Sequence, residues 1–134
     1  MVDMAHVNFD GLNLWITLTK QERRAIHMSE FVVPRANLAD VEYVADMWSH
    51  VRKDFGVRGI GYRRVLLWGS AYDDFGQDFC ILDNSDRGLI ITLSRDSHAR
   101  VMLSLPPTEA WPLYARLREV IDEDARHRQI SPSG

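Results

Sequence analysis

The chain has very little cysteine: Cys80 is the single one among 134 residues. One cysteine excludes an internal disulfide bond and any zinc site built from paired cysteines, and it is typical of a protein kept in a reducing compartment. The first ten residues contain two aspartates but neither lysine nor arginine, so they lack the basic start of a secretory signal. We therefore expect a cytoplasmic protein.

Long apolar runs and an excess of positive charge are also missing. No stretch approaches the roughly 18 apolar residues that a membrane-spanning helix needs. Lysine and arginine together number 16 against 19 acidic residues, which gives a net charge of -3. Nucleic-acid-binding domains usually carry a basic surface, so this balance argues against that class of partner. We expect no transmembrane segment and no nucleic-acid partner.

What is present suffices for one folded domain. The chain is 46% hydrophobic and 26% charged, close to the averages for globular proteins. A chain of this length typically buries about two-thirds of the surface that it exposes when unfolded. We find no internal repeat. The sequence predicts a single domain over residues 1–130, followed by a flexible tail at 131–134.

Most of the periodic segments have the patterns of β-strands. Residues 12–18 alternate apolar and mixed positions, and residues 31–33 form a strand-like run in which Pro34 marks an edge, a bulge or a strand end. Residues 38–44 fit either a strand or a helix, and periodicity leaves that choice open. Four further strand segments, joined by short turn-rich connectors, predict an antiparallel meander: residues 65–68, 78–82, 88–93 and 100–105.

The remaining segments predict helix or loop. Residues 20–27 favour a short helical turn between strands, and residues 48–62, which contain three glycines among charged residues, favour a long loop. Two prolines end the last strand, and an amphipathic helix opens at Thr108, where Pro112 fits only within the first turn. One apolar face of this helix contains Leu113, Leu117, Val120 and Ile121.

This order of elements resembles the pleckstrin-homology-like fold and, more narrowly, small bacterial proteins of that fold with no assigned function. The segments that carry the resemblance are Phe31-Val32-Val33-Pro34, Val41-Glu42-Tyr43-Val44, Leu67-Trp68-Gly69-Ser70-Ala71-Tyr72 and Asp78-Phe79-Cys80-Ile81. The resemblance implies a mainly β (α+β) domain: a bent antiparallel β-sandwich or barrel of about seven strands, capped by one C-terminal amphipathic helix. It also implies a non-enzymatic module that binds lipids, proteins or copies of itself. The chain departs from these relatives by lacking membrane helices and by having Pro106-Pro107-Thr108 where an aspartate-proline pair would open the last helix.

Two basic clusters form the candidate ligand site. One lies in the segment 52–64, with five positive residues against Asp54, and the other lies in the first connection between strands. Such asymmetry in an acidic chain can steer an anionic partner, such as a phospholipid headgroup or an acidic ligand, although a solvated loop explains the same residues. The tentative ligand-binding residues are Lys20, Arg23, Arg24, Arg52, Lys53, Arg58, Arg63 and Arg64.

Other residues with reactive or metal-binding side chains show no pattern of a catalytic, metal or cofactor site. The five histidines are scattered without ligand spacing, the aspartates between positions 73 and 86 lack the spacing of a calcium loop, and Cys80 lies within an apolar strand. We therefore expect no enzyme activity, no metal and no cofactor. The histidines are His6, His27, His50, His98 and His127.

Aromatic residues offer a surface for protein contact. The tryptophans and several tyrosines cannot all lie on one inward face by alternation, and partly exposed aromatic residues are favoured at interfaces. Burial of both sheet faces is the alternative. Our leading hypothesis is an interaction module that acts through protein contact or self-association, at a sheet edge or an exposed aromatic patch. The alternative is binding of anionic ligands or headgroups through the basic segment 52–64.

Overall fold

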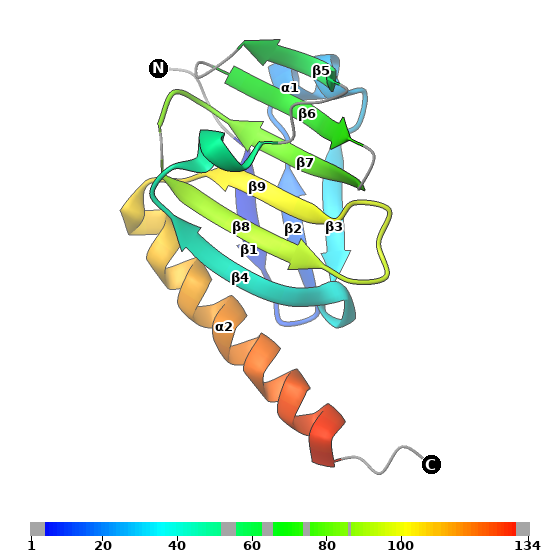
Figure 1. Cartoon of the computed structure of the whole chain (residues 1–134), viewed down its shortest axis with the longest axis vertical. Coiled ribbons are helices and arrows are strands. Elements are labelled where there is room, and N and C mark those ends of the chain that lie inside the picture. Colours follow the sequence, from blue (N-terminus) through cyan, green and yellow to red (C-terminus); the bar gives the residue numbers. More distant parts are fainter. Residues whose placement is uncertain (1–4, 52–55, 63–65, 74–75, 86, 131–134) are drawn as a thin grey trace.

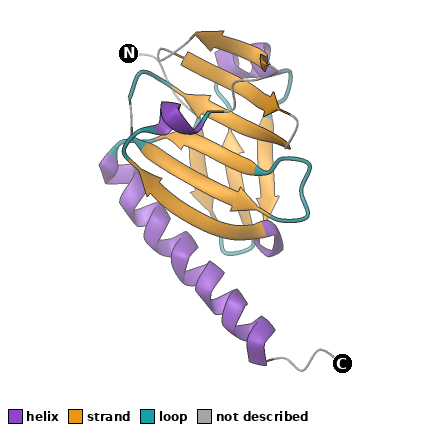
Figure 2. Ribbon diagram, viewed as in Figure 1, coloured by secondary structure: helices purple, strands orange, loops and turns teal. Residues whose placement is uncertain are grey.

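The structure is a computed structural model that describes residues 5–51, 56–62, 66–73, 76–85 and 87–130. For residues 56–58, 60, 62, 66, 129 and 130 it describes the backbone only. The described chain forms two β-sheets and two α-helices (Figures 1 and 2). It is mainly β with a long C-terminal helix, so this part of the expected fold is confirmed.

The smaller sheet is antiparallel and has the order β1-β2-β3, formed by β1 (His6–Phe9), β2 (Asn13–Thr17) and β3 (Glu30–Pro34). β2 and β3 confirm the two strand predictions for this region, and Pro34 ends an edge strand as expected. The strand β1 was not predicted. Helix α1 (Lys20–Ile26) connects β2 to β3, and a capping box starts it, because Thr19 Oγ1 accepts from the Glu22 amide while Glu22 Oε1 accepts from the Thr19 amide.

Residues 38–44, which sequence patterns left open between strand and helix, form strand β4 (Leu38–Val44) after a 3₁₀ turn, η1 (Arg35–Asn37). A bulge lies between Leu38 and Asp40, where the register against the neighbouring strand shifts. The extra residue puts Leu38 and Val41 in the same buried core although they are three positions apart. This spacing imitates a helical period, which explains the ambiguity.

The larger sheet has six strands in the order β4-β8-β9-β7-β6-β5. β7 and β9 pair in parallel, so the four later strand segments do not form the antiparallel meander that their short connectors predicted. The turn 94–99 joins β8 and β9 as an antiparallel pair, and β9 then lies against β7 rather than after it. The remaining bounds are β5 (Gly56–Tyr62), β6 (Leu66–Asp73), β7 (Gly76–Leu82), β8 (Gly88–Leu93) and β9 (Arg100–Ser104).

The prediction of a long loop over residues 48–62 is wrong. The segment contains a 3₁₀ turn, η2 (Met47–His50), and strand β5, which pairs with β6. Gly59 lies opposite Gly69 with a φ of 130°, and a Cβ atom there would lie 2.0 Å from the Trp68 carbonyl oxygen. The glycine therefore permits close strand pairing, whereas the sequence pattern attributed it to a loop.

The main core lies between the two sheets, and α2 (Pro107–Ile130) closes one side of it. Figure 1 shows α2 running along β4 and continuing beyond the sheets. Leu117 and Ile121 are buried and Leu113 and Val120 are partly buried, which confirms the predicted apolar face. Pro112 is the sixth helical residue, beyond the first turn in which we expected it.

A second, smaller core covers the other face of the larger sheet. Met47 and Trp48 of η2 pack there against residues that include the fully buried Cys80, and the Trp48 indole donates to the Asp83 carbonyl. Both faces of this sheet are therefore covered in the region of β7 and β9. This is the alternative that the sequence left open for the aromatic residues. Trp48 and Trp68 are buried, whereas Trp111 is 50% exposed.

Candidate functional site

The basic residues predicted as a ligand site are only partly described. Lys20, Arg23 and Arg24 lie exposed on α1, and α1 packs beside β5 and β6. The structure thus brings the first basic cluster next to the strand that contains Arg58, of which only the backbone is described. The other basic positions of segment 52–64 lie outside the described residues: Arg52, Lys53, Arg63 and Arg64.

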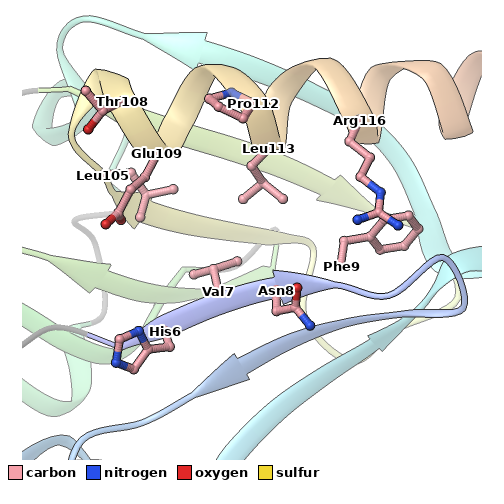
Figure 3. Close-up of a pocket in the computed structure, with 10 residues that line it drawn as sticks. All are labelled: His6, Val7, Asn8, Phe9, Leu105, Thr108, Glu109, Pro112, Leu113 and Arg116. Atoms are coloured by element: carbon pink, nitrogen blue, oxygen red, sulfur yellow. The ribbon is translucent and has the colours of Figure 1, made fainter.

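A groove of about 350 Å³ lies between β1 and the first three turns of α2 (Figure 3). This volume is at the lower end of the range of small-molecule and peptide pockets. Val7 and Leu113 point toward one another across the groove, from β1 and α2. The lining consists of His6, Val7, Asn8, Phe9, Leu105, Thr108, Glu109, Pro112, Leu113 and Arg116.

Among the strands that the structure describes, the strand that borders this groove has one unpaired edge, because β1 pairs only with β2. The hairpin closes with the Asp10 amide donating to the Asn13 carbonyl at 3.2 Å. Hydrogen-bonded pairs alternate in an antiparallel ladder, so His6 and Asn8 bond to β2. The peptide groups of Val7 and Phe9 therefore point away from β2, toward the open edge.

The hairpin that presents β1 is fastened by one side chain. The Asp10 carboxylate accepts hydrogen bonds from the amides of Leu12 and Asn13 and from the Trp15 indole, at 2.8 to 2.9 Å. The Asn13 and Leu12 amides, followed by the indole, hold the pKa of Asp10 below its usual value. Trp15, which lies on the face of β2 opposite the buried Leu14 and Ile16, thus has a local structural role.

The two ends of the groove carry opposite charges. Arg116 lies at one end, with its guanidinium carbon 5.3 Å from the centre of the Phe9 ring. Glu109 lies at the other end, in the first turn of α2, near His6 (Figure 3). Both charged side chains are exposed, and neither has an ion-pair partner among the described residues.

The opposite side of α2 is closed against β4. Arg118 donates to Asp40 at 2.5 Å, to the Val41 carbonyl at 3.4 Å and to Asp122 at 3.0 Å. These bonds, of which the one to Asp40 is foremost, raise the pKa of Arg118. Trp111 stacks on Tyr43 with ring centres 4.3 Å apart. Part of the free edge of β4 is therefore already occupied by the helix.

Ser70 of β6 meets a histidine and an aspartate of the turn 94–99, which lies far from it in sequence. Ser70 Oγ lies 3.0 Å from His98 Nε2, and His98 Nδ1 lies 3.9 Å from Asp96 Oδ1. The second distance is too long for the hydrogen bond that orients a catalytic imidazole, and the same Asp96 oxygen accepts from the His98 amide at 3.0 Å. Burial lowers the pKa of His98, and its ring packs edge-on against Phe31. This arrangement fits a neutral, hydrogen-bonded core histidine.

One buried ion pair was not anticipated from the sequence. Asp78 is fully buried and binds Arg100 through two hydrogen bonds, at 2.6 and 3.1 Å, and Arg100 also donates to the His50 carbonyl. Asp78 begins a predicted strand, and through Arg100 it ties β7 to β9, the parallel pair, and to His50 of η2. Its role is structural.

Within the described residues, no helix has the length and apolar character to cross a membrane. Nor does this part of the chain hold a group of three or more potential ligand side chains that could bind a metal ion.

No family model, no curated protein and no solved structure matches the chain. Sequence patterns missed the groove because β1 alternates polar and apolar residues over four positions only, which is the shortest run that can indicate a strand.

Proposed function

We propose that this protein is a non-enzymatic interaction module that receives an extended segment of a partner protein at the edge of β1. The observation that supports the proposal is the groove itself, in which unpaired peptide groups of an edge strand lie beside an open helix face. Addition of a strand to such an edge supplies main-chain hydrogen bonds at little cost. Side chains of α2 then contact the added segment from the other side.

The same edge offers a route to self-association, because β1 of a second copy is also an extended segment. We favour a partner segment over a second copy, since α2 borders the open edge and the groove is narrow. In that case the protein alone stays monomeric in light scattering over a wide concentration range. A dimer that is lost in a variant of β1 would identify the second copy as the occupant.

We also propose that the fold is of the pleckstrin-homology-like type. Two packed sheets and a C-terminal helix support it. The parallel pairing of β7 with β9 and the order of the six-stranded sheet differ from a seven-strand antiparallel meander. The interaction function proposed here depends on the groove and not on that assignment.

Selection from a random peptide display library tests the function. We expect enrichment of peptides whose binding protects the Val7 and Phe9 amides from hydrogen exchange, because these amides lie on the unpaired edge. The Asn8 amide, already bonded to β2, serves as the internal control. Protection of Val7 and Phe9 that is absent without peptide and present with it is the signature of strand addition.

Two substitutions at one position separate strand addition from other contacts. Val7→Pro removes the outward donor without removing a bond to β2, and proline is tolerated at sheet edges. Val7→Thr keeps the amide and the branched shape. We expect Val7→Pro to abolish peptide binding and Val7→Thr to retain it, with both variants folded by circular dichroism. Peptides that bind Val7→Pro as well as the unmodified protein would contradict the proposal, as would a library that yields no binder.

Binding of anionic ligands or phospholipid headgroups is the second candidate. The position of α1 beside β5 favours it, because the exposed Lys20, Arg23 and Arg24 then lie next to the strand that contains Arg58. Liposome co-sedimentation with and without anionic lipid tests it. Binding that depends on lipid charge, weakens with salt and is lost when Arg58, Arg63 and Arg64 are reversed to glutamate would support this function. Binding that ignores these changes would exclude it.

A further inference from the structure

The arginines that connect elements of this fold differ in whether they bind a carboxylate of the chain. Arg35, Arg100 and Arg118 each bind a carboxylate of the chain itself, at 2.5 to 2.8 Å. Arg116 lies between α2 and β1 but has no carboxylate partner among the described residues. Its guanidinium stands over the Phe9 ring at the end of the groove, where an aromatic face positions the cation and leaves its donors available.

The spacing of the two charges matches an extended segment. Glu109 and Arg116 are seven residues apart on α2, which corresponds to about 10 Å along the helix axis. The four residues of β1 span a similar distance of about 10 Å along the strand. The helix and the strand run side by side in the same direction (Figure 3). A segment added along β1 therefore passes both charges within about four residues.

We propose that the groove selects a partner segment that carries an acidic side chain for Arg116 and a basic side chain for Glu109, about three to four positions apart, with a small apolar residue between them. This inference rests on the strand-addition function proposed above and names its ligand class. The middle position is apolar because Val7 and Leu113 line the groove between its charged ends. The charges set the specificity, while the main-chain bonds to Val7 and Phe9 hold the segment.

The test uses two matched probes and the full-length protein. The first is the acetylated and amidated peptide Lys-Thr-Val-Thr-Asp, and the second is Lys-Thr-Val-Thr-Lys, which differs at one end only. Each is titrated into isotope-labelled protein and followed by the amide signals of Val7 and Phe9. We expect the unmodified protein to bind the Lys/Asp peptide about fivefold more tightly than the Lys/Lys peptide, the size of effect typical of a partly exposed ion pair.

A charge reversal completes the test. Arg116→Glu should reverse the preference, so that the Lys/Lys peptide binds about fivefold more tightly than the Lys/Asp peptide. Arg116 is exposed, so the variant should fold, and Arg116→Gln, which should show no preference, provides a second variant. Equal binding of both peptides to the unmodified protein and to Arg116→Glu, with loss of both in Val7→Pro, would overturn the charge selection and leave strand addition intact. Failure of either peptide to bind at millimolar concentration, together with an empty display selection, would overturn both proposals.

Discussion

Helix α2 borders two edge strands, β4 and β1, and contacts them differently. On the β4 side, Arg118 reaches the Val41 carbonyl and Asp40, and Trp111 covers Tyr43. On the β1 side, Leu113 and Val7 face each other across an open groove, and Arg116 has no acidic partner among the described residues. The same helix thus closes one sheet edge and leaves the other accessible.

The two strand edges differ in how far they are protected against pairing with another chain. Unpaired strand edges promote unwanted association, and proteins usually cover them or place charges along them. α2 protects β4 in this way with an arginine that binds the edge backbone directly. Among the described residues, α2 makes no such hydrogen bond to the edge of β1, although it lies beside that edge. The proposed strand addition uses this edge, and the helix beside it would restrict access to one extended segment.

Truncating the buried side chain that holds α2 against the core should have the largest effect on stability. Leu117 of α2 is fully buried, so Leu117→Ala should lower the free energy of unfolding by about 3 kcal/mol, through lost transfer energy and a residual cavity. Leu113, which faces the groove and is only partly buried, is the matched control, and Leu113→Ala should cost about 1 kcal/mol. Urea denaturation measures both. Equal losses would show that the β1 side is packed as tightly as the core, against the comparison.

The aromatic contact on the closed side should have an intermediate effect. Trp111 stacks on Tyr43 and contacts Tyr114 edge-on, at 5.7 Å between ring centres. A double-mutant cycle with Trp111→Ala and Tyr43→Ala should give a coupling energy of about 1 kcal/mol, the usual value for an aromatic pair. Peptide binding at β1 should not change in either single variant. A coupling energy near zero would mean that Trp111 is free and available as a separate contact surface.

Local patterns predicted the elements with a regular apolar pattern. β2 and the apolar face of α2 each bury one periodic set of positions, and β8 is a continuous apolar run that is buried on both faces of the sheet. β4 was ambiguous for a definite reason: its bulge places Leu38 and Val41 in one core at a helical spacing. β5 was missed because a glycine-rich strand whose glycines allow close pairing cannot be distinguished by composition from a glycine-rich loop.

The groove and the sheet order depend on long-range contacts that local patterns do not contain. β1 is only four residues long, and its open edge is defined by the position of α2, about a hundred residues later in the chain. The parallel pairing of β7 with β9 brings together Asp78 and Arg100, which begin two predicted strands and lie 22 positions apart in sequence. The predicted basic site likewise combines the first connection with segment 52–64, and the fold places α1 beside β5, the part of that segment that it describes.

The two arginines of α2 provide the smallest and most specific test of the comparison. Arg118→Gln should lower the free energy of unfolding by about 1 kcal/mol, because it weakens bonds to Asp40 and the Val41 carbonyl at a partly exposed site. Arg116→Gln should change it by less than about 0.5 kcal/mol, because Arg116 lies over the Phe9 ring and has no ion pair among the described residues. Thermal unfolding at low and high salt measures both, and only the Arg118 effect should decrease with salt. If Arg116→Gln proves as destabilising as Arg118→Gln, Arg116 belongs to the packing of α2 on β1, and it does not act as an open anion site.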